Sequence, residues 1–160
     1  MVVDISFKIT YRGPITAIMK RRKWNNEVEK PSWSAVGLFH KRTHLQKHFH
    51  ATGAAEYGYY TRSAKYIHDK QEKVGHNIPL VYTGQLRDEA LGASEVRPTS
   101  KGVKVVLRAR VKGTSRLATR MGNELRAISD AEAVRLARVK DANIRGRLSN
   151  VRAGWTTIIH

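Results

Sequence analysis

Residues 93–112, ASEVRPTSKGVKVVLRARVK, contain the clearest structural pattern in the chain. From residue 102 onward, apolar and basic side chains alternate, which is typical of a β-strand with one buried face. Residues 93–98 precede this strand across a short polar turn, so we expect the two segments to form a hairpin. The inner face would carry Val103, Val105, Leu107, Ala109 and Val111, and the outer face Lys104, Arg108, Arg110 and Lys112.

Outside the hairpin, the sequence predicts one more strand and two early helices. Residues 3–11 alternate in the same way, which indicates a half-buried strand. Apolar spacing near 3.6 residues predicts helices over 34–50 and 55–72. The expected apolar stripes are Ala35, Leu38, Leu45 and Phe49 on the first helix, and Tyr57, Tyr60, Ala64 and Ile67 on the second.

Two later helices are expected from their N-caps. Thr83 is expected to cap a short helix over 84–91. Ser129 and Glu132 have the spacing of a capping box, which predicts the start of the last helix. Together these elements predict an α+β fold, in which about three to four helices pack on a small, mostly antiparallel sheet. The last helix would carry an apolar stripe of Ala133, Ala137, Ile144 and Leu148.

The length of 160 residues fits a single domain, 1–160, with two extensions. Residues 20–33 lack a useful period and are expected to form an arm or long loop. Residues 150–160 are expected to form a C-terminal tail, in which 155–159 could add a closing strand. No apolar run approaches the roughly 20 residues of a membrane span, and the N-terminus does not read as a signal peptide.

The amino-acid composition limits the kinds of reaction and binding site that the protein can have. The chain has no cysteine, which excludes a disulfide scaffold, a thiolate nucleophile and a cysteine-based zinc finger. We find no nucleophile elbow, phosphate-binding glycine loop or isolated acid–base pair. We therefore expect no enzymatic activity, no cofactor and no small-molecule substrate.

The formal net charge of +17 favours a polyanionic or acidic partner. Residues 1–53 carry 10 basic and 3 acidic side chains, and residues 107–160 carry 12 and 4, whereas the middle is nearly balanced. A surface that is merely kept solvated is the alternative. The expected contacts with nucleic acid or an acidic partner are Lys20, Arg21, Arg22, Lys23, Lys104, Arg108, Arg110 and Lys112.

Three histidines, His40, His44 and His48, recur every four residues and could in principle chelate zinc or nickel. However, no carboxylate lies between the first two, and the neighbouring lysines and arginine would repel a dication. A helical wheel places the three histidines opposite the apolar stripe. We therefore expect an exposed face without a metal.

Residues 66–87 contain YIHDK, a glycine-containing turn and then PLVYTGQLR. This arrangement resembles the neck and tail-completion (virion morphogenesis, head–tail joining) proteins of tailed bacteriophages. In that family a Pro-Leu-x-x-Thr-Gly-x-Leu segment follows a basic helix and precedes a short helix and a hairpin. The resemblance covers about residues 55–115, and the matching residues are Pro79, Leu80, Thr83, Gly84 and Leu86.

The resemblance implies a structural virion subunit that forms a homo-oligomeric ring around the DNA channel at the head–tail junction. Its partners would be portal or adaptor proteins, tail-tube or tail-terminator proteins and the genomic DNA, with no membrane. The protein would reside in the virion after assembly in the host cytoplasm. Within such a ring, we expect Trp24, Trp33 and Trp155 to anchor the subunit interfaces.

The alternative is a basic protein of the ribosome-associated type that binds nucleic acid without sequence specificity. The sequence pI of about 10.6 and the arginine-rich last third favour it. No recognised helix-turn-helix, zinc-finger or RNA-binding signature is present.

Overall fold

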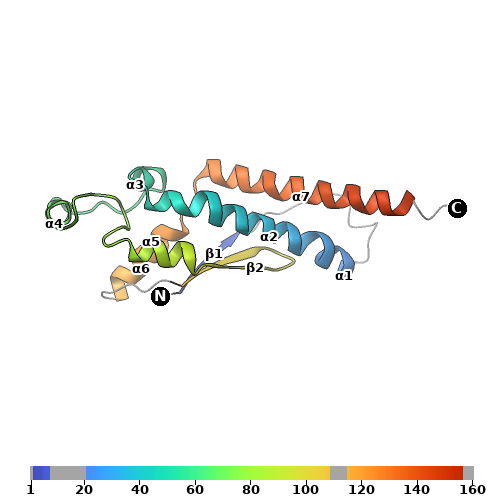
Figure 1. Cartoon of the computed structure of the whole chain (residues 1–160), viewed down its shortest axis with the longest axis horizontal. Helices are drawn as coiled ribbons and strands as arrows, with labels where there is room; N and C mark the ends of the chain where they lie inside the picture. Colours follow the sequence, from blue (N-terminus) through green and yellow to red (C-terminus); the bar gives the residue numbers. More distant parts are fainter. Residues whose placement is uncertain (1, 8–20, 109–114, 157–160) are drawn as a thin grey trace.

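The structure, a computed structural model, describes residues 2–7, 21–108 and 115–156 (Figure 1). The elements form three layers, with the long helix α7 (Asp130–Thr156) on one side and a small sheet on the other. A helical rod over residues 21–49 lies between them and packs against both. The predicted α+β class with a small antiparallel sheet is therefore confirmed.

The sheet has the strand order β1-β3-β2, from β1 (Val2–Phe7), β3 (Val103–Arg108) and β2 (Glu95–Pro98). Both pairings are antiparallel. The expected hairpin is confirmed, and Val103, Val105 and Leu107 are buried while Lys104 and Arg108 are exposed. The expected strand positions Ile9, Tyr11, Ala109, Arg110, Val111 and Lys112 lie outside the described residues.

The rod replaces the expected arm at 20–33, and that prediction is wrong from residue 21 onward. It comprises α1 (Arg21–Trp24), a π-turn η2 (Asn25–Glu29), α2 (Lys30–Phe39), a π-turn η3 (His40–His44) and a 3₁₀ turn η4 (Leu45–Phe49). Pro31 cannot donate a backbone hydrogen bond and would clash in a regular helix. The wide turn η2 directly precedes it, so the chain stays helical through the proline.

The two π-turns also change which residues of the rod face inward. A wheel of uniform 100° steps placed Leu38 inside and the three histidines outside. In the structure Leu38 is 40% exposed, whereas His40, His44 and His48 are buried. Both expectations are wrong, because π and 3₁₀ turns advance the chain by a different angle per residue than an α-helix does.

The expected helix 55–72 is interrupted, and its apolar stripe is only partly confirmed. α3 (Gly53–Glu56) ends near Gly58, which has a φ of +60°, and α4 (Ala64–Val74) begins after Ser63, whose side chain accepts a bond from the Tyr66 N–H. Tyr57 is buried, whereas Tyr60 and Ile67 are 52% and 40% exposed. α4 stands at the far left of Figure 1, beyond the end of the sheet.

The last helices differ from expectation in cap and length. α5 (Gln85–Gly92) follows Gly84, which has a φ of +82° and occupies the N-cap position expected for Thr83. α6 (Ser115–Arg126) was not expected. α7 begins after Ser129, whose hydroxyl accepts the Glu132 N–H at 3.4 Å, so its predicted start is confirmed.

α7 continues through Thr156, so a closing strand at 155–156 is wrong, and residues 157–160 lie outside the described residues. Its buried positions are Glu132, Leu136, Lys140 and Ile144, with Leu148 partly buried. Ile144 and Leu148 belong to the predicted stripe, whereas Ala133 is exposed and Ala137 partly exposed. The inner face of α7 therefore carries two charged residues.

Candidate functional site

An open hollow lies between the rod and the tip of the β2–β3 hairpin. It has a volume of about 650 Å³ and is lined by Arg22, Asn25, Asn26, Lys30 and Ser100. We call these five residues the basic hollow. Four of them come from α1, η2 and the first residue of α2, and Ser100 comes from the hairpin turn. Segments about 70 residues apart in sequence thus meet at one surface.

Among the described residues, the side chains that line the basic hollow include two cations and no carboxylate. Glu29, from the same turn, is directed elsewhere: its Oε2 lies 3.2 Å from Lys140 Nζ on α7, and its Oε1 accepts a bond from Trp24 Nε1 at 3.3 Å. The Lys140 ammonium also lies 4.2 Å from the centre of the Trp33 ring. These contacts hold the acidic side chain on the inner side of the rod, away from the hollow.

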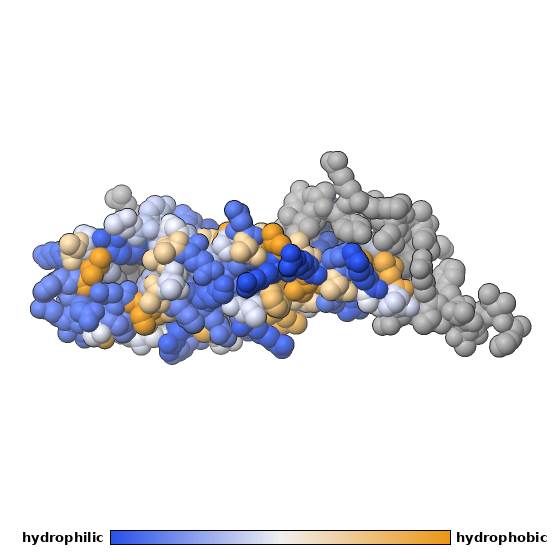
Figure 2. Space-filling model, turned by 90° about the horizontal axis from the view of Figure 1, so that it is seen from above, coloured by the Kyte–Doolittle hydropathy of each residue, from blue (hydrophilic) through white to orange (hydrophobic). Residues whose placement is uncertain are grey.

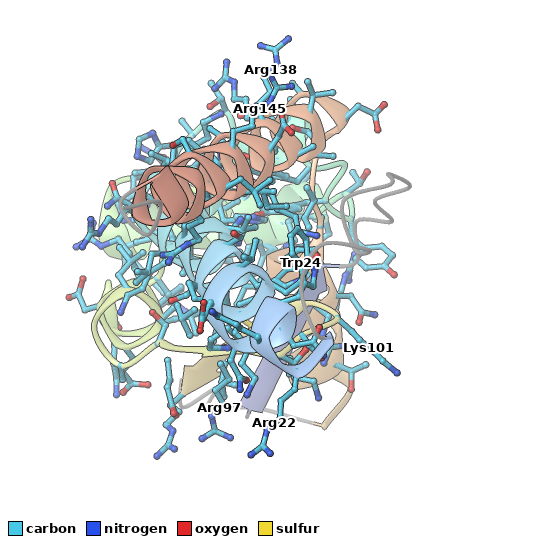
Figure 3. The ribbon with its side chains drawn as sticks, turned by 90° about the vertical axis from the view of Figure 1, so that its right-hand side faces the viewer. Arg22, Trp24, Arg97, Lys101, Arg138 and Arg145 are labelled. Carbon is cyan, nitrogen blue, oxygen red and sulfur yellow. The ribbon has the colours of Figure 1, made fainter. Side chains whose placement is uncertain are left out.

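The outer face of the hairpin, which is turned away from the rod, carries further basic residues. Arg97, Lys104 and Arg108 are exposed, and Glu95 lies 2.7 Å from Arg97 and 3.5 Å from Arg108. In Figure 3, Arg22 and Arg97 point away from α7, while Arg138 and Arg145 project from the opposite side of the molecule. Hydrophilic residues also dominate the described surface when the molecule is seen from the α7 side (Figure 2).

The structure brings part of the predicted basic set together. Arg22 reaches the hollow, and Lys23 is exposed beside it in sequence. Lys104 and Arg108 form the described part of the predicted stripe. Arg21 is described only as backbone, and Lys20, Arg110 and Lys112 lie outside the described residues.

The predicted interface anchors Trp24 and Trp33 are wrong. They are only 5% and 1% exposed, because the helical rod turns both indoles inward. Trp24 packs with Val28 and Ile144 in a small second core, and Trp33 belongs to the main core. Both tryptophans hold the rod in the fold. Trp155 lies within α7, and its side chain is not described.

The segment from Pro79 to Leu86 links the core to α5. Leu80 and Val81 are buried, and Leu86 packs against the same core from a partly exposed position. Leu80 has a φ of +58°, which is unusual for a residue other than glycine. Its burial holds this backbone conformation in place. Pro79 is partly exposed and Thr83 is exposed, so the motif threonine is available to a partner.

A buried polar cluster lies where the rod meets α7 and the chain after α3. His44 Nδ1 lies 3.0 Å from Glu132 Oε1, which also accepts a bond from the Tyr57 hydroxyl at 2.5 Å. The ring of Tyr57 stacks on that of His48 at 3.8 Å, and His48 Nδ1 is 2.5 Å from the Tyr59 hydroxyl. With His40, these residues form the histidine cluster.

Burial sets the charge state of the cluster. It lowers the pKa of His40 to about 3, with the neighbouring His48 and His44 adding to the effect. It also lowers the pKa of His48 to about 4, against an opposing attraction from Glu56, and lowers the pKa of His44 despite Glu132. Burial raises the pKa of the Tyr57 and Tyr59 hydroxyls. The histidines are therefore neutral at pH 7 and act as packing and hydrogen-bonding groups.

The three histidines of the cluster are not among the described groups whose ligand atoms lie close together. Within the described ranges, the single group of three suitable ligands whose atoms lie within 4.8 Å of one another is His68, Asp69 and Glu72. That group lies on the outer surface of α4, where His68 and Glu72 form an exposed pair 3.6 Å apart. Exposed groups of this kind are common without a metal.

Sequence reasoning missed two buried acids, Glu124 and Glu132. Glu124 accepts bonds from Arg62 at 2.7 and 2.6 Å and from the Tyr60 N–H at 3.2 Å, so it fixes the segment between α3 and α4. For Glu132, the sequence indicated only a role in the capping box with Ser129. Its carboxylate is instead used by Tyr57 and His44, and the pattern of the sequence carries no signal for either contact.

Comparison with protein-family models, curated proteins and solved structures found no match to this chain. Among the described residues, no helix combines the length and the apolar character needed to cross a membrane.

Proposed function

We propose that this protein is a structural virion subunit of a tailed phage, of the neck or tail-completion kind, which forms a ring around the DNA channel at the head–tail junction. One observation carries the proposal: the order of elements around residues 79–87. α4 precedes this segment, α5 follows it and the β2–β3 hairpin comes next. This is the order that the resemblance to the family implies.

The surface of the fold is also suited to assembly. Within the described part of the sheet, β1 and β2 each pair with β3 alone, so each has an edge that a neighbouring subunit could extend. A ring requires a heterologous contact between two different patches. Two different strand edges on one subunit meet this requirement, and the buried Trp24 and Trp33 are not needed for it.

A second candidate function is sequence-independent nucleic-acid binding by a monomer, and the basic hollow favours it. Its lining of cations, amides and a hydroxyl offers donors to phosphates and is not organised to read base edges. The two candidates differ in assembly state, because the ring requires contacts between subunits whereas the second function does not.

The two candidate functions can be distinguished by light scattering at about 50 and about 200 mM salt, with and without a random-sequence DNA duplex. We expect that the protein alone is an oligomer whose mass is the same at both salt concentrations. A monomer of 18.1 kDa that binds the duplex with a steep salt dependence would contradict the ring and support the second candidate.

A further inference from the structure

We propose that the basic hollow binds the phosphodiester backbone of double-stranded nucleic acid. This inference deepens the proposed function and rests on it: if the subunit surrounds DNA, the side that carries Arg22, Lys30 and the hairpin tip faces the duplex. The outer face of α7 would then face away from it.

The lining of the hollow matches phosphate chemistry. Arg22 supplies a guanidinium and Lys30 an ammonium, and both side chains are exposed. Asn25 and Asn26 supply amide donors and Ser100 a hydroxyl. These are the side chains that contact phosphate and sugar in protein–DNA complexes, where arginine binds phosphate in a planar, two-donor geometry.

The local backbone explains why these donors gather at one place. The π-turn η2 carries Asn25 and Asn26 between Arg22 and Lys30, and π-turns often occur at functional sites. The nearby carboxylate of Glu29 is held on the opposite side of the rod by Lys140 and Trp24. Two acidic residues, Glu27 and Glu29, belong to the same turn, but among the described residues neither they nor any other acid lines the hollow.

The shape of the hollow favours a chain of phosphates over a small anion. It is open to the surface, and one wall is the tip of a hairpin whose outer face also carries the exposed Arg97 and Lys104. An isolated phosphate ion would leave most of a volume of about 650 Å³ unfilled. A duplex backbone crossing the hollow could contact both the rod and the hairpin.

The outer face of α7 provides a control with matched charge. Arg138 and Arg145 are exposed and project from the side opposite Arg22 (Figure 3). Removal of two positive charges at either place changes the net charge of the protein equally. Only the pair in the hollow is expected to contact phosphate.

The experiment measures binding of the full chain to a fluorescein-labelled random-sequence duplex by anisotropy, between about 50 and about 200 mM salt. Arg22→Gln/Lys30→Gln is compared with Arg138→Gln/Arg145→Gln, and circular dichroism checks that both variants fold. Each lost phosphate contact lowers the slope of log K against log salt by about 0.9. We expect the hollow variant to lose about 2 from the slope and the control to keep it.

Two outcomes would overturn the inference. One is an equal loss of slope in both variants, which would mean that only total charge matters. The other is displacement of the duplex from the wild-type protein by inorganic phosphate at constant ionic strength, which would identify a site for the free ion. Because the comparison is between two variants, its result is independent of oligomer mass, so this inference and the ring can fail separately.

Discussion

At Gly37 the rod and the sheet come so close that no side chain fits between them. A Cβ atom at this position would lie 2.5 Å from Val96 Cγ1 and 2.7 Å from Val103 Cγ2. Both valines belong to the hairpin, and Gly37 itself is buried. The glycine therefore sets the distance between two layers, although its place in the helix lowers helix propensity.

We predict that Gly37→Ala destabilises the fold by about 1–3 kcal/mol, because the core must shift to accept the methyl group. Gly146→Ala is the matched control, since a Cβ atom at this exposed glycine of α7 would meet no other part of the molecule within 4 Å. The control is expected to be neutral or more stable by about 0.5–1 kcal/mol. Urea unfolding measures both, and equal stabilities would refute the close layer contact.

Glu132 connects three elements through a single carboxylate. It accepts the Tyr57 hydroxyl, lies against His44 and is 3.8 Å from Lys47 Nζ. We predict that Glu132→Ala lowers the free energy of unfolding by about 2–3 kcal/mol, because the buried Tyr57 donor loses its partner. Glu72→Ala, which removes an exposed carboxylate on α4, should change it by less than about 0.5 kcal/mol.

Thermal or urea unfolding of the two glutamate variants side by side provides the test. If Glu132→Ala is as stable as Glu72→Ala, the carboxylate does not hold the rod, α7 and Tyr57 together.

At the scale of elements, the contact between the rod and α7 depends on pH through the histidine cluster. His40 and His48 have pKa values of about 3 and about 4 in the fold, against 6.5 when unfolded. Below pH 6.5 the unfolded chain binds protons that the folded chain does not. Stability is therefore fully present above pH 6.5 and falls as the pH is lowered toward the folded-state values.

We predict a loss of about 2 kcal/mol per histidine between pH 6.5 and about pH 5. His48→Gln should reduce this pH dependence, whereas His68→Gln should leave it unchanged, because His68 is exposed on α4. Urea unfolding at the two pH values compares the variants. A wild-type protein that is equally stable at both would show that the histidines are not buried as described.

The sequence was sufficient to predict those helices and strands whose residue pattern is local and regular. Alternation identified β1 and the hairpin, and the capping-box spacing of Ser129 and Glu132 identified the start of α7. The first part of the rod, residues 21–33, was missed because the π-turn η2 interrupts the 3.6-residue period and Pro31 suggests a helix breaker. α6 was missed although Leu117, Met121 and Leu125 recur every four residues, a pattern that predicts a helix.

The candidate site was predictable only in part. Charge clustering identified Arg22 and the outer face of β3, because exposed basic residues remain exposed in most folds. The meeting of Arg22 with Ser100 depends on tertiary packing, which no local pattern encodes. The burial of three histidines and two tryptophans could not be predicted from the sequence either. It depends on partners far along the chain, such as Glu132 and Lys140.

At the scale of the whole molecule, the described structure has two opposite sides that both carry exposed basic residues. Arg22 and Arg97 lie on one side, and Arg138 and Arg145 project from the outer face of α7 on the other (Figure 3). Positive charge on both sides opposes close packing of copies face to face. Association through the edges of the sheet would avoid this repulsion and leave the basic hollow free for DNA.

The most direct test of the proposed ring is two-dimensional class averaging of electron micrographs of the purified protein. The account predicts closed rings with a central opening and one fixed number of subunits, because heterologous contacts that close generate a ring. Open filaments, two-fold dimers or an absence of any assembled particle would contradict it.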